Sequence, residues 1–252
     1  MQSIYLSIVI PAYNEEERIG KTLRRVDAYL KEQVFSAEII VVIDGAKDDT
    51  AHVVRGLQSE IANLHIIDRK ENRGKGYTVR EGMLAAKGEI RLFTDADNST
   101  DISHFDKMRP LFSKDYDVVI CSRDKKDVAG ATQAVPQSFL KRQLGNMGNL
   151  FIQLFAVRGI WDTQCGFKAF RAEAAERIFS RAKIDRWGFD VEVLALARKF
   201  CYKIGMVPAY WINDPKSHVK LSGYLQVLWE TLKIWWWLRT GSYELPLRSP
   251  SL

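Results

Sequence analysis

The sequence predicts an α/β fold in which a mostly parallel sheet is flanked by helices. Five short apolar segments alternate with segments of helical character in the first half of the chain. Strands that are apolar throughout are typical of parallel sheets covered on both faces. Each apolar segment ends in polar residues, and ligands bind at the carboxyl ends of the strands in such sheets. With 252 residues, the chain is long enough for such a domain to bury a full core.

The five apolar segments define the expected strands. They lie at Tyr5–Pro11, Glu38–Ile43, Leu64–Ile67, Glu89–Phe93 and Asp117–Ser122. Helices are expected between them, over about 14–30, 49–58 and 76–86. The first of these helices would carry Glu15–Glu17 in its first turn, where the helix dipole favours acids.

The pattern changes after Arg123, where a polar loop is expected over 124–136. An amphipathic helix is expected over Gln137–Ala156, because its apolar residues recur near a 3.6-residue period. A turn followed by a short strand is expected within Trp161–Arg171, and a final strand at Lys203–Trp211. Further helices are expected over about 172–180, 186–199 and 223–239, before a short tail.

The chain is basic, with a formal net charge of +6 and a sequence pI near 9.1. Such a charge favours a partner that carries phosphates, an anionic membrane surface or nucleic acid. We expect no nucleic acid partner, because the sequence has no basic and aromatic motif of a nucleic-acid-binding module.

The three cysteines are far apart, and no Cys-x-x-Cys pair is present. This spacing indicates neither a structural zinc site nor a disulfide framework, so a reducing compartment is the simplest expectation. Met1–Leu6 has no basic segment before an apolar core and does not match a signal peptide. The sequence contains no run of about 18 uninterrupted apolar residues, so we expect no ordinary transmembrane helix.

Two carboxylates, Asp95 and Asp97, follow the strand expected at Glu89–Phe93. Residues two apart in a strand point to the same side, so both side chains can turn toward one point at the strand end. Hard oxygen ligands of this kind suit Mg²⁺ or Mn²⁺, and through the metal a diphosphate. The alternative is a polar turn, since Asp and Asn favour turns.

Three other strand ends carry candidate binding residues. Tyr13 can stack on a base, although a plain strand-to-helix turn is the simpler explanation of this segment taken alone. Asp44 can accept a hydrogen bond from a base N–H, or it can cap a helix. The loop Asn72–Gly76 places small and basic residues before a helix, as anion-binding loops do, but it lacks the spacing of a Walker A motif.

These motifs occur in the order and spacing of family 2 inverting glycosyltransferases with a GT-A fold, which the chain resembles over about residues 4–222. The matching motifs are Pro11-Ala12-Tyr13-Asn14-Glu15, Asp44-Gly45 with Asp48 and Thr50, Asn72 with Gly74-Lys75-Gly76, and Asp95-Ala96-Asp97. The segments Asp162–Lys168 and Trp187–Glu192 resemble the polyprenyl-phosphate branch of that family. This branch holds dolichyl-phosphate mannose synthases and dolichyl-phosphate β-glucosyltransferases, and Asp162–Lys168 is most similar to the glucosyl type.

The resemblance implies a Rossmann-like glycosyltransferase domain over 1–222. Its nucleotide-sugar half would span about 1–123 and its acceptor half about 124–222, including an interfacial helix at 137–156. Residues 223–252 would form a C-terminal amphipathic helix at the membrane interface and a tail.

The reaction implied by the resemblance is a metal-dependent, inverting transfer of a hexose, with glucose favoured, to a dolichyl-like polyprenyl phosphate. UDP-glucose is the favoured donor and GDP-mannose is possible. The metal, Mg²⁺ or Mn²⁺, would be held by Asp95 and Asp97, with Asp97 binding it directly. The catalytic residues would be Asp97, Arg123, Arg142 and Asp190. Nucleotide-sugar contacts are expected at Pro11, Ala12, Tyr13, Glu15, Val42, Asp44, Lys75, Asp95, Ala96, Asp97, Arg123 and Lys220.

The implied acceptor needs no general base, because a phosphate monoester is largely ionised at pH 7. It needs a basic clamp that holds two anions in line. Arg123 and Arg142 match the phosphate-binding arginines of the family, and Lys220 or His218 would close over the diphosphate. Each of these is otherwise a solvated surface charge.

Asp190 and Glu192 lie two apart where a helix is expected to begin. They can orient the sugar or supply a base to a hydroxyl acceptor, but the helix dipole alone also favours acids there. A family 2 enzyme with a hydroxyl acceptor and a non-catalytic nucleotide-sugar-binding module therefore remain the alternatives.

Two helices can bring the chain to a membrane surface. Gln137–Ala156 combines an apolar stripe with basic residues, and Trp229–Trp237 holds four of the seven tryptophans, with Glu230 and Lys233 on the opposite arc. Tryptophan prefers the level of the lipid headgroups, and amphipathic helices lie in the plane of the interface. We expect a peripheral enzyme at the cytoplasmic face of a membrane. Core packing and a homo-oligomer contact through the C-terminal helix are the alternatives.

Overall fold

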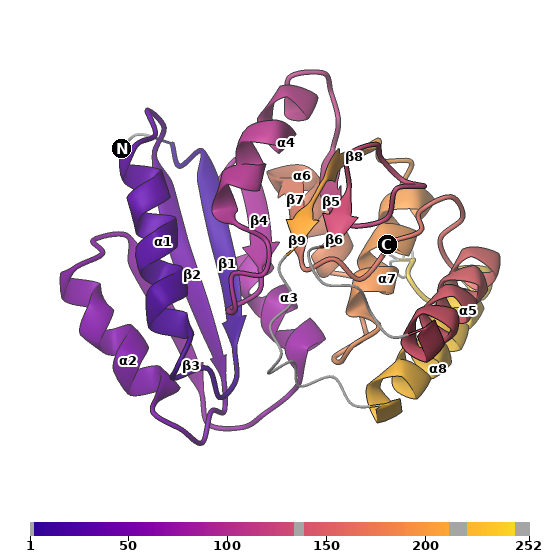
Figure 1. Ribbon diagram of the computed structural model, residues 1–252, viewed down its shortest axis with the longest axis horizontal. Coiled ribbons are helices and arrows are strands. Elements are labelled where there is room, and N and C mark those ends of the chain that lie inside the picture. The colour runs from indigo at the N-terminus through magenta and orange to yellow at the C-terminus, as the bar shows by residue number, and fades with distance from the viewer. Residues whose placement is uncertain (1–2, 134–138, 212–220, 245–252) are drawn as a thin grey trace, which may run out of the picture.

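The computed structural model describes residues 3–133, 139–211 and 221–244. Its main strands are β1 (Leu6–Ala12), β2 (Ala37–Asp44), β3 (Leu64–Arg69), β4 (Ile90–Thr94), β5 (Val118–Ser122), β7 (Phe167–Arg171) and β8 (Ile204–Pro208). They form one seven-stranded sheet in the order β3-β2-β1-β4-β7-β5-β8 (Figure 1). All neighbours are parallel except β7, which runs antiparallel to β4 and β5. The predicted mostly parallel sheet is therefore confirmed.

Helices cover both faces of this sheet (Figure 1). One layer contains α1 (Ile19–Lys31), α2 (Thr50–Gly56) and α4 (Phe105–Phe112), and the other contains α3 (Lys75–Ala85), α6 (Ala172–Phe179) and α7 (Phe189–Lys199). Ile8 and Ile10 of β1 pack against the first layer and Val9 against the second. Successive side chains of a strand point to opposite faces, so a strand buried on both sides must be apolar throughout.

The first helix begins later than predicted, at Ile19 instead of near residue 14. Asn14 has a φ of 55°, and the backbone N–H of Glu15 donates to Thr50 Oγ1 at 2.7 Å. These features hold the segment in a turn, so Glu15–Glu17 precede the helix and are not part of its first turn.

Other elements also differ from the expectation. The short helices η2 (Ile102–His104) and α4 fill a stretch for which no helix was predicted, whereas η1 (Leu57–Ser59) extends α2 to about its predicted end. The strand expected over 203–211 is divided into β8 and β9 (Tyr210–Trp211). β9 pairs in parallel with β6 (Thr132–Gln133), which lies inside the segment predicted to be a loop.

Two further helices, α5 (Phe139–Phe155) and α8 (Leu221–Arg239), pack against each other at one end of the molecule (Figure 1). The rings of Phe155 and Trp235 meet edge to face with centroids 5.9 Å apart. α8 also packs against α7, and the buried carboxylate of Glu230 accepts a hydrogen bond from the Gly188 backbone N–H at 2.6 Å. Glu230 therefore lies on the face of α8 that meets the domain, while Trp229 and Trp236 are exposed. Within the described residues, no helix combines the length and the hydropathy that a membrane span requires.

Candidate active site

The ends of β1, β2, β4 and β5 bring the predicted site residues to one edge of the sheet. Asp95 follows β4, and its Oδ1 lies 2.6 Å from Nζ of Lys75, the first residue of α3. Burial acts to lower the pKa of Lys75, but the carboxylates of Asp95, Asp190 and Asp97 outweigh it and raise the pKa above its usual value. These four side chains, which come from three separate segments, therefore share one electrostatic environment.

Asp97 differs from its neighbours in its partners. Its Oδ1 accepts a hydrogen bond from the Ser99 backbone N–H at 2.9 Å, and no ion pair joins it to a basic side chain of the described residues. Ala96, between the two acids, is buried, and its carbonyl oxygen accepts a hydrogen bond from Thr22 Oγ1 at 2.6 Å. This bond fixes the backbone that carries Asp95 and Asp97.

Carboxylate oxygens are the donors that Mg²⁺ and Mn²⁺ prefer, so the chemistry of Asp95 and Asp97 fits the predicted cofactor. No group of three or more His, Cys, Asp or Glu side chains forms a ready-made cage in the described part of the chain. Mg²⁺ is commonly held by one or two carboxylates together with substrate phosphates, which is the arrangement that these residues allow.

The end of β1 supplies Pro11 and Ala12, which are buried, and Tyr13, whose side chain is 39% exposed. Glu15 Oε2 pairs with Arg18 Nη2 at 2.7 Å. Burial raises the pKa of Glu15 to about 6 against the opposing effect of Arg18, and the charges of Asp97 and Asp95 add to the rise. Glu15 is thus close enough to sense the charge of the two acids, while stacking of Tyr13 on a base stays a prediction.

Asp44 ends β2, and its buried carboxylate is fully engaged by neighbouring groups. It forms an ion pair with Arg69 and accepts hydrogen bonds from the backbone N–H groups of Arg73 and Gly74, both at 2.8 Å. Asp44 thereby fixes the loop that leads into Lys75, and its contact with a base stays a prediction. Val42 is fully buried in the core beside α3.

Arg123 follows β5 and is held by Asp162. Its Nε and Nη2 atoms donate to the two carboxylate oxygens at 2.8 and 2.7 Å, and its backbone N–H donates to Oδ2 at 2.8 Å. Burial lowers the pKa of Arg123, but Asp162 more than compensates and raises it, so the guanidinium stays charged. The structure therefore presents a fixed cation at the end of β5.

Asp190, in the first turn of α7, is buried against Lys168 of β7. Lys168 is fully buried, and its Nζ donates to the Asp190 carboxylate and to the Cys165 carbonyl oxygen, the latter at 2.6 Å. Burial raises the pKa of Asp190, although Lys168 and Lys75 oppose the shift.

Glu192 has a structural role that the predictions allowed for. Its carboxylate accepts hydrogen bonds from the backbone N–H groups of Lys183 and Ile184 and from the Tyr243 hydroxyl, at 2.8, 2.9 and 2.8 Å. These bonds tie α7 to the loop before it and to the chain after α8.

Three residues were not among the predicted site residues: Asp162, Gly166 and Lys168. A Cβ added to Gly166 would lie 2.1 Å from Asp95 Oδ2, so only glycine permits this loop to lie against the acid. All three lie in the segment Asp162–Lys168, whose resemblance to the polyprenyl-phosphate branch was the one feature of the sequence that pointed to them. The residues that they contact lie far away in the sequence.

The side chains of three predicted residues cannot be placed. Arg142 belongs to α5, but its side chain is outside the described part of the structure. Lys220 and His218 lie outside the described residues.

The fold and the site define a class of protein. Glucosyl-3-phosphoglycerate synthase from Mycobacterium tuberculosis, solved in complex with UDP, superposes with a TM-score of 0.65 at 15% sequence identity, covering 99% of this chain and 83% of that one. Mannosyl-3-phosphoglycerate synthase from Rubrobacter xylanophilus superposes with a TM-score of 0.62 at 16% identity, covering 99% and 78%. These similarities show the predicted GT-A fold.

Sequence comparison is more specific. The model of Glycosyl transferase family 2 matches residues 7–179. The dolichyl-phosphate β-glucosyltransferase of Dictyostelium discoideum is 37% identical over 220 residues, covering 84% of this chain and 67% of the relative. That of Homo sapiens is 31% identical over 256 residues, covering 96% and 74%. The chain belongs to glycosyl transferase family 2, in its polyprenyl-phosphate branch, and is a glycosyltransferase, as its motifs predicted.

Proposed function

We propose that this enzyme transfers glucose from UDP-glucose to a dolichyl-like polyprenyl phosphate, with inversion, at the cytoplasmic face of a membrane and with Mg²⁺ or Mn²⁺. The names of the relatives support the sugar and the acceptor. The Mycobacterium tuberculosis synthase has been solved in complex with Mn²⁺, UDP-glucose and phosphoglyceric acid, which supports the donor and the metal.

The observation on which the proposal depends most is how the acids of the site are paired. Asp95 forms an ion pair with Lys75, Asp162 with Arg123, and Asp190 with Lys168. Burial raises the pKa of Asp190, but Lys168 occupies its carboxylate, as Lys75 and Arg123 occupy the other two, whereas an acceptor phosphate is already ionised at pH 7 and needs no base. The pairing therefore favours a phosphate over a hydroxyl group as the attacking group.

Asp97 and Asp95 would hold the metal, which when bound neutralises charge on the diphosphate leaving group. Lys75 places a positive charge beside the same acids and is positioned by its pair with Asp95. Asp44 keeps the loop before Lys75 in place.

Arg123 would hold the acceptor phosphate. Its bidentate pair with Asp162 fixes the plane of the guanidinium, so the N–H groups not used by Asp162 have a set direction. Arg142 is proposed as a second phosphate ligand, on the basis of its position in the sequence. Fixed donors of this type orient two anions without reorganisation during the reaction.

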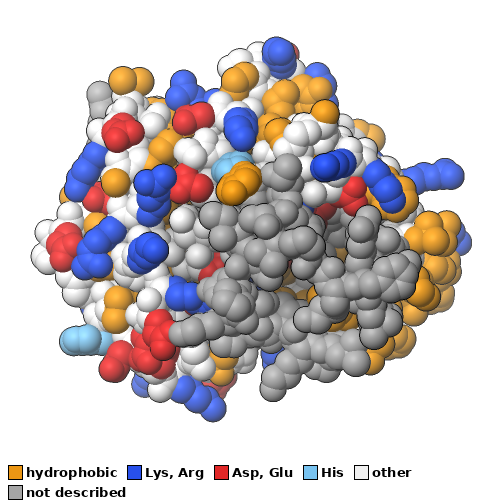
Figure 2. Space-filling view, viewed as in Figure 1, with side chains coloured by type: hydrophobic (Ala, Val, Ile, Leu, Met, Phe, Trp, Pro, Cys, Tyr) orange, Lys and Arg blue, Asp and Glu red, His pale blue; other side chains and the backbone are white. Residues whose placement is uncertain are grey.

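An apolar surface on α5 and α8 supports action at a membrane. We use the name apolar face for seven side chains that are each more than half exposed: Met147, Leu150, Leu154, Tyr224, Leu225, Trp229 and Trp236. Figure 2 shows hydrophobic side chains gathered at the edge of the molecule where Figure 1 places these helices. A patch this apolar marks a protein or membrane contact, and the tryptophans favour a membrane.

The test is a donor screen with mass analysis of the lipid product, using UDP-glucose and GDP-mannose with polyprenyl phosphate and Mg²⁺ or Mn²⁺. Glucosyl polyprenyl phosphate is the expected product. Asp97→Asn is expected to reduce kcat/KM by at least about 100-fold, because it removes a charged ligand at the leaving group. Transfer to a hydroxyl acceptor alone, or full activity of the variant, would contradict the proposal.

A further inference from the structure

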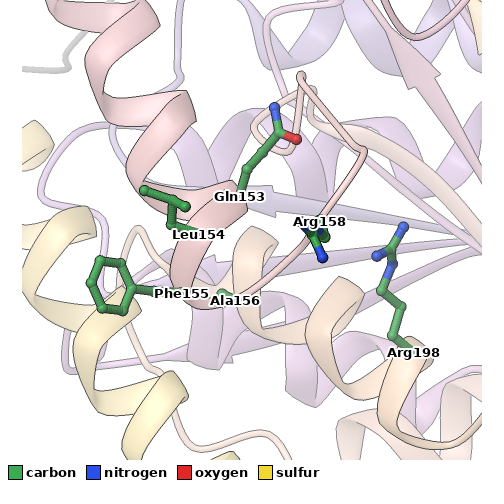
Figure 3. A pocket seen from close by; sticks show the side chains of 6 residues that line it. All are labelled: Gln153, Leu154, Phe155, Ala156, Arg158 and Arg198. Atoms are coloured by element: carbon green, nitrogen blue, oxygen red, sulfur yellow. The ribbon is translucent and has the colours of Figure 1, made fainter.

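A hollow of about 400 Å³ opens at the C-terminal end of α5, lined by Gln153, Leu154, Phe155, Ala156, Arg158 and Arg198 (Figure 3). Arg198 lies in the last turn of α7, while Asp190 lies in its first turn. At a rise of 1.5 Å per residue, the two are about 12 Å apart along the helix axis. The hollow is therefore separate from the strand ends that hold the donor.

Two guanidinium groups from different elements approach this hollow. Arg158, from the loop after α5, and Arg198, from α7, both line it (Figure 3). A Cβ added to Gly159 would lie 3.9 Å from Arg198 Nη2, which shows how closely that loop approaches α7. Because the two cations belong to separate elements, the fold itself brings them together.

Neither arginine has an acidic partner among the residues that the structure describes. Burial alone lowers the pKa of Arg198, with no carboxylate to oppose it. The C-termini of α5 and α7 attract cations, but each offers only about half an elementary charge. Two full positive charges thus remain available to an anion.

Gln153 adds a hydrogen-bond donor. Its Oε1 accepts from the Gly159 backbone N–H at 2.9 Å, which assigns the other end of the amide as the N–H₂ group. That nitrogen, Nε2, is buried and has no partner in the described part of the structure. Buried polar groups normally have hydrogen-bond partners, so this donor can serve an acceptor that enters the hollow.

The position of the hollow suggests the source of the anion. Leu154 lines it and, at 73% exposure, also belongs to the apolar face. In the loop that carries Arg158, the ring of Trp161 has Lys126 Nζ 3.7 Å from its centroid. Cations and aromatic rings beside an exposed apolar helix are typical of surfaces that meet anionic lipid headgroups.

We propose that this hollow binds the phosphate of an anionic phospholipid headgroup through Arg158, Arg198 and the Gln153 amide. The proposal rests on the membrane-surface action proposed above. It adds a second phosphate site, which orients the enzyme on the membrane and does not take part in the reaction. Two guanidinium groups and one amide are the donors that phosphate oxygens require.

The test is co-flotation of the full chain with phosphatidylcholine vesicles, with and without phosphatidylglycerol. The wild-type enzyme should bind the anionic vesicles more tightly, and Arg158→Ala with Arg198→Ala should reduce this binding by about 5- to 30-fold. Binding to neutral vesicles should not change. Lys21→Ala with Arg24→Ala removes the same charge from α1, far from α5 in Figure 1, and should have a much smaller effect. Equal losses in the two double variants would overturn the proposal.

Gln153→Glu gives a nearly isosteric test. The variant keeps an acceptor for the Gly159 N–H but replaces the free donor by a negative charge, so anionic vesicles should bind as weakly as with the arginine variants. Inorganic phosphate, titrated into the enzyme without lipid at constant ionic strength, separates the two sources of the anion. If the wild-type enzyme binds millimolar phosphate, and the double arginine variant loses this binding but still floats with anionic vesicles, the hollow takes free phosphate and the lipid assignment is wrong.

Activity distinguishes this proposal from the proposed function. In detergent, transfer to a short-chain polyprenyl phosphate should be the same in the wild-type enzyme and in all these variants. Failure of the wild-type enzyme to transfer would count against the proposed function, and unchanged flotation of the arginine variant would count against the headgroup site.

Discussion

At the scale of single residues, the site shows how a cluster of carboxylates can bind a substrate that carries phosphates without strong repulsion. Three acids of the site, Asp95, Asp162 and Asp190, are each paired with a lysine or arginine, so their charge is neutralised within the protein. Burying such pairs is costly, and removing one partner leaves an uncompensated charge. Because of these pairs, the site presents less negative charge to a bound diphosphate than its carboxylates alone would.

The pair formed by Lys168 and Asp190 provides the first prediction. Lys168→Met would leave the buried Asp190 carboxylate without its cation and should lower the free energy of unfolding by about 3–5 kcal/mol. Urea denaturation measures this change. Adding Asp190→Asn removes the stranded charge and should restore part of the loss. A loss below about 1 kcal/mol in the single variant would show that the pair is not a buried unit.

Gly166 provides the second prediction. Gly166→Ala should displace Asp95, because the new methyl group would lie 2.1 Å from Oδ2. A displacement near 1 Å at a catalytic centre costs about 100-fold in kcat/KM. The matched control is Gly56→Ala, where a Cβ meets nothing within 4 Å and activity should be unchanged. Steady-state kinetics with UDP-glucose measures both, and equal activities would contradict the role of Gly166.

Glu15 provides a prediction of pH dependence. Its pKa is raised from 4.5 to about 6 in the folded state, chiefly by burial, so the folded protein favours the protonated form. The resulting stability is fully present below pH 4.5 and is lost as the pH rises through about 6. The unfolding free energy of the wild type, minus that of Glu15→Gln, should therefore fall over this interval. Urea denaturation across a pH series measures the difference, and parallel curves would contradict the shift.

The sequence could predict those site residues that local motifs reveal. Asp95, Asp97 and Lys75 are recognisable because each lies at the end of a strand or the start of a helix. Lys168 was missed because its partner, Asp190, lies on another element, and nothing local shows that the two meet. Arg123 was predicted, but its bond to Asp162 is equally non-local.

At the scale of elements, the same distinction between local and distant contacts applies. The strands could be predicted because an apolar segment is a local feature. The insertion of β7 between β4 and β5 depends on pairing across long sequence separations, so the antiparallel strand was not placed. The late start of α1 depends on a bond from Glu15 to Thr50, again a distant residue.

The contact between α7 and α8 gives the prediction that belongs to this scale. Glu230 of α8 accepts a hydrogen bond from the Gly188 N–H just before α7, where helix N–H groups lack partners. Glu230→Ala should lower the free energy of unfolding by about 1–3 kcal/mol. Glu230→Gln keeps an acceptor and should cost less. Chemical denaturation measures both, and equal losses would indicate that charge, not the hydrogen bond, stabilises the contact.

At the scale of the whole molecule, the apolar face and the active site are linked through α7 and α8. Asp190 lies at the start of α7, and Glu230 holds that start from α8. Beyond α8, the Tyr243 hydroxyl donates to Glu192 of α7 at 2.8 Å. Removing everything after β9 would therefore disturb the site as well as the apolar face, so membrane binding has to be tested by point substitutions.

Such substitutions exist at Trp229 and Trp236, which are 60% and 59% exposed. Trp229→Ala with Trp236→Ala should weaken binding to neutral vesicles by about tenfold or more, because apolar surface no longer enters the lipid. The free energy of unfolding should change little, since the two rings face solvent. Val34→Ala, at a fully exposed apolar residue between α1 and β2, is the control and should leave binding unchanged.

Flotation measures the binding, and light scattering over a range of protein concentrations detects self-association. A concentration-dependent dimer that the tryptophan variant abolishes, with flotation unaltered, would assign the apolar face to a second copy of the chain and not to a membrane.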